Sequence, residues 1–538
     1  MSGLTYEQEV ARRRSFAIIA HPDAGKTTLT EKLLLYGGAI HLAGSVKSRK
    51  ANKHASSDWM EIEKQRGISV TSSVLQFDYD GYRVNILDTP GHQDFSEDTY
   101  RTLMAADSAV MLIDVAKGVE TQTKKLFKVC RDRGIPVFTF INKLDRAGKE
   151  PFALMEELEE VLGIRSYPMN WPVGIPGGYK GVYNRVKKQI ELFEMSGRHG
   201  ASILPSKAGG VDDAAFKEEL GEEFHKQLCD EIELLDGAGE VFDWEKIQQG
   251  QLTPLFFGSA MTNFGVEPFL QEFLKMAPPP SPRKTLQGNV DPTEKKFSAF
   301  VFKIQANMNP AHRDRLAFIR ICSGVFEKGM EVKHAQTGKM IKLAQPQQFL
   351  AQERSIVEEA FPGDIIGLFD PGSMGIGDSL VSAGLNATFT DFPVFPPEHF
   401  ARVQPKNSMK RKQFLKAMEE LAQEGAIQVF SNPMLSGEGF VIGAVGTLQF
   451  DVFKHRVEGE YGVNILLEPL GHSLARWLPR GVTTKEMKGL DKAVVVQDRW
   501  QDPVLLFESN WALRWAMEQN PDIEFLLTPA SRESLVEK

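Results

Sequence analysis

The sequence predicts an α/β domain with a mostly parallel sheet, followed by a small β-barrel and a C-terminal α+β domain. Over the first 150 residues, short apolar runs alternate with helical patterns, which indicates parallel strands joined by right-handed crossovers. Three consecutive prolines at 278–280 end this part, because they stop both a helix and a central strand. Short β-like runs with Gly-rich turns follow, and a helix–strand mixture resumes from Pro396.

The first domain is expected over 1–277. A buried strand over 15–20 precedes a helix from about Lys26, and further β-rich runs lie at 82–87, 108–115, 136–141 and 253–257. Residues from about 151 to 250 interrupt this alternation, so we expect an insertion there. The barrel is expected over 285–390, from runs at 297–304, 315–321 and 364–368, and the α+β domain over 391–538.

Composition is that of an ordinary globular protein. The 538 residues carry a formal net charge of -8, with 42% hydrophobic and 25% charged residues, which excludes disordered and collagen-like chains. The three cysteines, Cys130, Cys229 and Cys322, form no Cys-x-x-Cys pair, so we expect neither a disulfide framework nor a zinc ribbon. The polar N-terminus and the short apolar run 16–20 predict no signal peptide, and we expect a cytoplasmic protein.

The acidity of the chain is concentrated in one segment. Residues 211–247 hold thirteen Asp or Glu against three Lys. This pattern is typical of a solvated face on amphipathic helices, and a contact surface for a basic protein is the alternative.

The first chemical motif follows the first strand and opens a helix. In such a loop, backbone N–H groups and the positive end of the helix point at an anion. Gly25 lets the backbone approach phosphate oxygens, Lys26 can reach the β and γ phosphates, and the Thr27 hydroxyl can bind Mg²⁺. The strict phosphate-loop consensus begins with Gly, whereas this chain has Ala20 at that position. The candidate phosphate-binding residues are His21, Pro22, Asp23, Ala24, Gly25, Lys26, Thr27 and Thr28.

The second motif, Asp88-Thr89-Pro90-Gly91-His92, ends the run 82–87. A carboxylate there can hold Mg²⁺ through water, and we assign this role to Asp88. The backbone N–H of Gly91 can sense a γ-phosphate. His92 can order an attacking water or accept its proton, a role that the adjoining motif favours over a structural one.

The third motif, Asn142-Lys143-Leu144-Asp145, follows the run 136–141. Guanine offers N1–H and its N2 amine side by side, which the Asp145 carboxylate can accept together, whereas adenine lacks this pair. Asn142 can bridge base and phosphate loop, and the stem of Lys143 can lie along the base. A fourth segment, Ser259-Ala260, can offer a backbone N–H to guanine O6.

The order of these motifs carries the functional prediction. Phosphate loop, Mg²⁺ carboxylate, base reader and second base contact appear in the sequence that a P-loop GTPase domain requires, each after an expected strand. The sequence therefore predicts an α/β P-loop GTPase domain, and Asp145 argues against an ATPase.

The same residues resemble the translational GTPases. The resemblance rests on His-Pro-Asp-Ala-Gly-Lys-Thr-Thr, Asp-Thr-Pro-Gly-His and Asn-Lys-Leu-Asp, and on 66–71, which is similar to the family's first switch segment. It implies that Ser69, a Thr in most relatives, binds Mg²⁺ and the γ-phosphate through its hydroxyl. It also implies that Asp23 helps to hold a monovalent cation near the phosphates.

Within the family, the segment 57–69, the Pro of the phosphate loop and the chain length are most similar to members that act at translation termination. The resemblance implies a ribosome-dependent GTPase that helps class I release factors to dissociate after peptide release, as a monomer away from membranes. An elongation-like or ribosome-protection GTPase is one alternative, although few residues remain for a further RNA-inserting domain. A non-hydrolysing, GTP-gated scaffold is another.

A basic cluster supports a ribosomal partner. Between positions 402 and 416 the chain has no acidic residue, and such a cluster can neutralise RNA phosphates, although a solvated helix face is the alternative. The cluster contains Arg402, Lys406, Lys410, Arg411, Lys412 and Lys416.

For catalysis we expect in-line attack of water on the γ-phosphate. The sequence pattern marks no Arg as an arginine finger, so GTP turnover without the ribosome should be slow, about 10⁻⁴ to 10⁻² s⁻¹.

Overall fold

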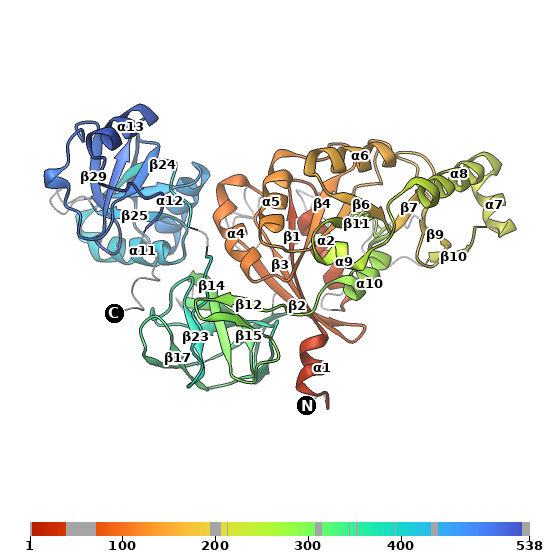
Figure 1. Cartoon of the computed structure of the whole chain (residues 1–538), viewed down its shortest axis with the longest axis horizontal. Helices are drawn as coiled ribbons and strands as arrows, with labels where there is room; N and C mark the ends of the chain where they lie inside the picture. Colours follow the sequence, from red (N-terminus) through yellow and green to blue (C-terminus); the bar gives the residue numbers. More distant parts are fainter. Residues whose placement is uncertain are drawn as a thin grey trace.

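The computed structural model describes residues 3–38, 71–193, 206–211, 213–306, 315–343, 345–350, 353–392, 394–431 and 439–529. Figure 1 shows a central sheet with helices, a smaller all-β part below it and a third part beside both. The predicted fold class, an α/β domain followed by a barrel-like β part and an α+β part, is confirmed.

A seven-stranded sheet forms the centre of the first part, in the order β2-β3-β1-β4-β5-β11-β6. All its pairs are parallel except β2 with β3. Its strands are β1 (Arg13–Ala20), β2 (Ser73–Tyr79), β3 (Tyr82–Asp88), β4 (Ser108–Asp114), β5 (Val137–Asn142), β6 (Arg165–Pro168) and β11 (Leu252–Phe257). The expected strands are therefore present, and the antiparallel edge strand β2 adds to them.

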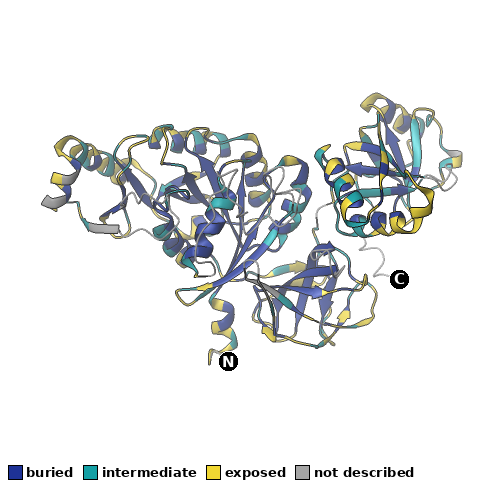
Figure 2. Ribbon diagram, turned by 180° about the vertical axis from the view of Figure 1, so that it is seen from behind, coloured by how far each residue is buried: buried dark blue, intermediate teal, exposed yellow. Residues whose placement is uncertain are grey.

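Helices cover both faces of this sheet, which explains the uninterrupted apolar runs of its strands. Along β1, Phe16 and Ile18 belong to one hydrophobic core, and Ala17 and Ile19 belong to the other. Figure 2 shows the central strands as buried. The helices of this part are α1 (Tyr6–Ala11), α2 (Lys26–Tyr36), α4 (Ser96–Met104), α5 (Thr121–Asp132), α6 (Pro151–Leu162), α9 (Trp244–Gln248) and α10 (Val266–Met276), with the 3₁₀ helix η1 (Gln93–Phe95).

The segment expected as an insertion builds mostly a unit of its own. Besides α6, α9 and β6, it forms an antiparallel sheet of β7 (Asn170–Val173), β8 (Gly181–Asn184), β9 (Gln189–Phe193) and β10 (Ser206–Gly210). The acidic helices α7 (Ala214–Leu220) and α8 (Glu222–Ala238) follow at the far end of the molecule (Figure 1). Because α8 buries Leu228 and Leu235 while Glu222 and Glu223 are exposed, it is amphipathic with an acidic solvent face.

The β part is an antiparallel sheet in the order β18-β17-β23-β14-β15-β22-β19-β20, and it packs around residues such as Val301 and Ile319. Two short pairs, β12–β13 and β16–β21, complete it. Its strands are β12 (Arg283–Thr285), β13 (Gly288–Val290), β14 (Ser298–Ala306), β15 (Arg315–Ser323), β16 (Phe326–Glu327), β17 (Glu331–His334), β18 (Met340–Lys342), β19 (Gln347–Leu350), β20 (Glu353–Ile356), β21 (Glu359–Ala360), β22 (Ile365–Phe369) and β23 (Ser379–Val381).

Buried ion pairs join the β part to the first part. The carboxylate of Asp107, which precedes β4, is fully buried and pairs with Arg320 of β15 and, at 2.7 Å, with Arg283 of β12. On the other side, Arg13 pairs with Asp364 at 2.8 Å, and both side chains are nearly buried. These contacts hold the two parts in one orientation.

The third part is an antiparallel sheet with helices, in the order β27-β24-β26-β25-β29-β30-β28. Its strands are β24 (His399–Pro405), β25 (Gln428–Ser431), β26 (Phe440–Ala444), β27 (Ile465–Leu470), β28 (Leu474–Trp477), β29 (Ala493–Gln497) and β30 (Pro503–Phe507). Its helices are η2 (Ser408–Lys410), α11 (Arg411–Gln423), α12 (Leu448–Glu460), η3 (Thr484–Glu486) and α13 (Asn510–Gln519). Across the described residues of the whole chain, every helix is too short or too polar to span a membrane.

Candidate active site

The motifs singled out in the sequence follow the carboxyl ends of neighbouring parallel strands. Ile18 of β1 is in register with Asp88 of β3, and Asp114 of β4 is in register with Asn142 of β5. Since the carboxyl ends of parallel strands lie at one edge of a sheet, the loops after β1, β3, β5 and β11 meet there.

The loop after β1 ends at Gly25, the N-cap of α2. Gly25 has φ 100°, and a Cβ atom on it would lie 2.3 Å from the amide nitrogen of Asn142. Only glycine fits this backbone and this close approach. Lys26, Thr27 and Thr28 form the first turn of α2, and Lys26 is buried. The loop therefore presents the N-terminus of an 11-residue helix to the edge of the sheet.

The segment after β3 lies against this loop. Asp88 is buried at the end of β3, and the hydroxyl of Thr89 donates to the carbonyl of Ile18 in β1 at 2.7 Å. A Cβ atom on Gly91 would lie 2.8 Å from the ammonium of Lys26 and 3.5 Å from Cα of Pro22. The absence of a side chain at Gly91 therefore lets the two predicted phosphate motifs meet.

His92 follows at the start of η1. Its Nδ1 accepts the backbone N–H of Asp94 at 3.2 Å and lies 3.3 Å from a carboxylate oxygen of the same residue. The side chain is 36% exposed, so water can reach the ring. An Nδ1 that accepts from the backbone leaves the ring proton of the neutral imidazole on Nε2.

Asn142 connects the remaining motifs. Its side-chain N–H donates to the carbonyl of Ala24 at 2.8 Å, and its carbonyl oxygen accepts the N–H of Ala260 at 2.9 Å. The same oxygen accepts the backbone N–H of Lys143 at 2.8 Å, where the backbone has φ 73°. One buried side chain thus fixes the loops after β1, β5 and β11 relative to one another.

The expected base readers lie together as well. The Ser259 hydroxyl donates to the Asp145 carboxylate at 2.5 Å, and the backbone N–H of Ser259 donates to Phe264 at 2.8 Å. The ammonium of Lys143 donates to the carbonyl of Asp23, so the Lys143 stem crosses between the two loops.

Two contacts were missed by the sequence reasoning. Asp114, at the end of β4, pairs with Lys143 at 2.8 Å. Burial raises the pKa of Asp114, but hydrogen bonds from Lys143 and the N–H of Ala116 outweigh it, so the net pKa is lowered. Its position at the carboxyl end of a strand between β1 and β5 is the signal that would have found it. His21 lies 3.3 Å from Glu120, which no motif indicates.

Some predicted residues lie elsewhere. Ser69 and the segment 57–70 lie outside the described residues. The basic cluster lies on the third part, at the end of β24, η2 and α11, away from the meeting loops (Figure 1). Lys406, Arg411 and Lys412 are exposed there, and the ammonium of Lys410 donates to the carbonyl of Gly462.

The donor set fits Mg²⁺ bound together with a phosphate. Mg²⁺ prefers oxygen ligands and in nucleotide sites uses one or two protein oxygens, phosphate oxygens and water. The Thr27 hydroxyl, in the first turn of α2, and the Asp88 carboxylate, at the end of β3, are such oxygens. Among the described residues, no three His, Cys, Asp or Glu side chains converge as a purely protein-bound metal requires.

Comparison with known proteins defines the class. Residues 11–279 match the family model of the elongation factor Tu GTP binding domain, and residues 296–383 match elongation factor G domain 2. A crystal structure of ttk003000868 from Thermus thermophilus has the same fold, with a TM-score of 0.69 and 22% identity over 91% of this chain and 72% of that one. The fold and the matched family models are those of a translational GTPase.

The remaining matches define the family. Residues 389–517 match the model of class II release factor RF3, C-terminal domain. Peptide chain release factor 3 of Symbiobacterium thermophilum is 60% identical, over 97% of this chain and 99% of that relative. The Listeria monocytogenes serovar 1/2a relative of the same name is 55% identical, over 96% and 98%. The chain belongs to the peptide chain release factor 3 family. It is a guanine-nucleotide-binding GTP hydrolase of translation termination. The family membership favours this function over the elongation-like and scaffold alternatives.

Proposed function

We propose that the chain hydrolyses GTP when it is bound to the ribosome, at the edge of the seven-stranded sheet, and that this reaction accompanies dissociation of class I release factors after peptide release. The observation that carries the residue assignment is the meeting of Lys26 with Gly91 while Asn142 ties the same loop to the base readers.

The phosphates bind at residues 21–28. Backbone N–H groups of the loop and the N-terminus of α2 stabilise their negative charge, and Lys26 adds a positive charge. The backbone N–H of Gly91 contacts the γ-phosphate, because its backbone lies beside the Lys26 ammonium. The segment 88–91 therefore distinguishes GTP from GDP. Asp23 helps to hold a monovalent cation at the same loop.

Guanine binds between the loops after β5 and β11. Asp145 accepts the N1–H and N2 amine donors of guanine, and the Ala260 region offers a backbone N–H to O6. Ser259 orients the Asp145 carboxylate through the 2.5 Å hydrogen bond. The stem of Lys143 packs along the base while its ammonium is held by Asp114 and Asp23.

Thr27 and Ser69 would hold Mg²⁺ through their hydroxyls, and Asp88 would hold it through water. When bound, the ion neutralises charge that develops on the phosphate oxygens. His92 positions the attacking water through its exposed edge, and Lys26 offsets negative charge on the phosphate. After hydrolysis, loss of the γ-phosphate releases the segment around Gly91. The ribosome supplies what the unaided site lacks.

The basic cluster contacts RNA of the ribosome through its backbone phosphates. Support comes from its exposure: Lys406, Arg411 and Lys412 are exposed, at the end of β24 and at the start of α11. The chain acts on ribosomes as a monomer, in the cytoplasm.

Release of a labelled class I release factor tests the proposal. Ribosomes that have released their peptide and still carry the fluorescent factor are mixed with this chain and GTP, GDP or no nucleotide. We expect the chain with GTP to accelerate dissociation, and a triple substitution Lys406→Ala, Arg411→Ala and Lys412→Ala to require higher protein concentration. Dissociation at the same rate with and without the chain would contradict the proposal.

A further inference from the structure

The carboxylate of Asp94 links the proposed catalytic residue to the third part of the molecule. One of its oxygens lies 3.3 Å from Nδ1 of His92. The other accepts the backbone N–H of Leu448, the first residue of α12, at 2.8 Å. Asp94 is 9% exposed, so this contact is shielded from water.

The N-terminus of α12 is suited to hold this carboxylate. The first N–H groups of a helix lack partners inside the helix, and its N-terminal end carries partial positive charge. A Cβ atom on Gly446 would lie 2.1 Å from the carboxyl carbon of Asp94, so the approach depends on glycine. The side chain of Gln449 fixes the turn, since it accepts the N–H groups of Val445 at 2.8 Å and Gly446 at 3.1 Å.

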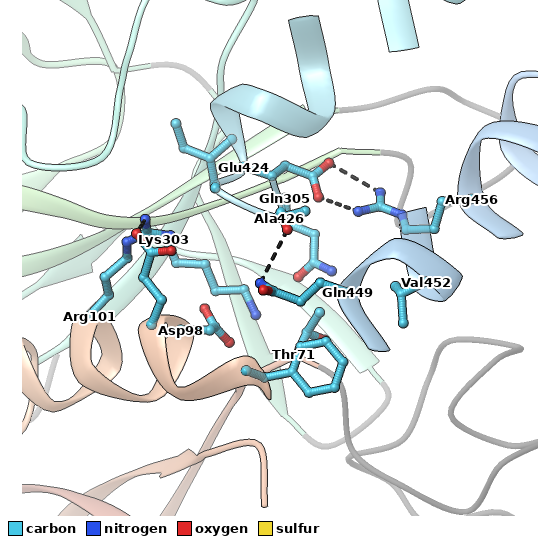
Figure 3. A pocket seen from close by; sticks show the side chains of 14 residues that line it. Thr71, Asp98, Arg101, Lys303, Gln305, Glu424, Ala426, Gln449, Val452 and Arg456 are labelled. Atoms are coloured by element: carbon cyan, nitrogen blue, oxygen red, sulfur yellow. Dashed lines mark hydrogen bonds and ion pairs between the residues drawn. The ribbon is translucent and has the colours of Figure 1, made fainter. Parts of the chain in front are cut away.

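Further contacts hold α12 in place beside α4 and the β part. Glu424 accepts the N–H of Ala306 in β14 at 2.8 Å and pairs with Arg456 of α12 at 2.5 Å. Figure 3 shows Glu424 and Arg456 beside a cavity of about 60 Å³ where all three parts meet. The side-chain N–H of Gln449 donates a hydrogen bond to the carbonyl of Ala426 there. At its edge, a Cβ atom on Gly425 would lie 2.0 Å from the guanidinium of Arg101. The docking is therefore specific.

We propose that Asp94 is a positioning residue for His92, and that the third part sets the orientation of His92 by holding Asp94 at the N-terminus of α12. This inference rests on the proposed function of His92. The hydrogen bond that orients the His92 ring comes from the backbone N–H of Asp94, inside the 3₁₀ turn that His92 caps, so a rearrangement that moves Asp94 away from α12 shifts this donor and with it the ring. Any rearrangement that withdraws α12 then leaves His92 without its support, and hydrolysis depends on how the third part is docked.

Gly446→Ala tests the proposal without changing His92 or Asp94. The added methyl group pushes the carboxylate away from α12, and a displacement of about 1 Å lowers ribosome-stimulated kcat by about 10²-fold. We expect GDP affinity and the KM for ribosomes to stay as in the unmodified chain. Gly459→Ala is the matched control, since it lies in α12, the helix whose N-terminus Gly446 precedes, with no atom near its Cβ position, and its kcat should be unchanged.

A second background separates positioning from a merely structural effect. In His92→Gln, the residual turnover should not fall further when Gly446→Ala is added, because the group that it positions is gone. The same 10²-fold loss in both backgrounds, or no loss in either, would overturn the proposal. Should Gly446→Ala fail to fold, as judged by GDP binding, Asp94→Ala replaces it with the same expectations. Full turnover by His92→Gln itself would instead refute the proposed role of His92, whatever Gly446 does.

Discussion

The side-chain amide of Asn142 donates a hydrogen bond to the carbonyl of Ala24 across 118 positions of sequence. The same side chain accepts the N–H of Ala260, so a single buried residue holds the phosphate loop and the second base contact. Nucleotide affinity should therefore depend on Asn142, although these hydrogen bonds of its side chain are made to the protein itself.

Asn142→Ala should weaken GDP binding by about 10- to 100-fold. The change leaves the carbonyl of Ala24 and the N–H of Ala260 without their partners, and 10- to 100-fold corresponds to about 1.4–2.8 kcal/mol, the cost of about one such unpaired group. Titration with a fluorescent GDP measures the effect. Gln251→Ala, an exposed site in the same part of the chain, is the control and should bind as the unmodified chain does.

Asp145→Asn should move nucleotide preference from GTP toward XTP. The amide can donate to the 2-oxo group of xanthine, whereas it loses one acceptor for the donor pair of guanine. Its oxygen can still accept the Ser259 hydroxyl, so the loop should survive. Competition between GTP and XTP measures the preference. Equal GTP affinity in both proteins would remove Asp145 as base reader.

The sequence predicts the strands of the site well, because each strand is buried on both faces and therefore consists of a continuous run of apolar residues. The bridging role of Asn142 also follows from its motif. Asp114 was missed because its contact with Lys143 depends on strand order. The contact of Asp94 with Leu448 joins residues 354 positions apart, between two separately folded parts, and no local pattern encodes such a pairing. The two base contacts are predicted only because the motif order points to guanine, and they stay predictions.

The thiols should differ in reactivity with pH. Burial raises the pKa of Cys130 and of Cys322 to about 12, so both stay as neutral thiols up to strongly alkaline pH, whereas Cys229 is partly exposed. The thiolate is the reactive form. A chromogenic disulfide reagent at pH 8 should thus label one thiol in the folded chain and three after denaturation. Cys229→Ser should abolish the fast reaction; rapid labelling of Cys130 in the folded chain would contradict the burial argument.

Asp107→Ala should destabilise the chain by about 3–5 kcal/mol, because it leaves the buried guanidinium of Arg320 and the half-buried one of Arg283 without their carboxylate. The midpoint of urea denaturation measures the loss. The exposed Asp132 is the control, and Asp132→Ala should change stability by no more than about 0.5 kcal/mol. A midpoint that Asp107→Ala leaves unchanged would mean that the pair does not join the two parts.

The most direct test of the account is GTP hydrolysis by the purified chain with and without 70S ribosomes, with ATP as the nucleotide control and His92→Ala as the variant. We expect slow hydrolysis alone, strong stimulation by ribosomes for GTP only, and loss of stimulation in His92→Ala with GDP binding retained. Tight guanine-nucleotide binding without any stimulation by ribosomes, or stimulated turnover that His92→Ala leaves intact, would contradict it.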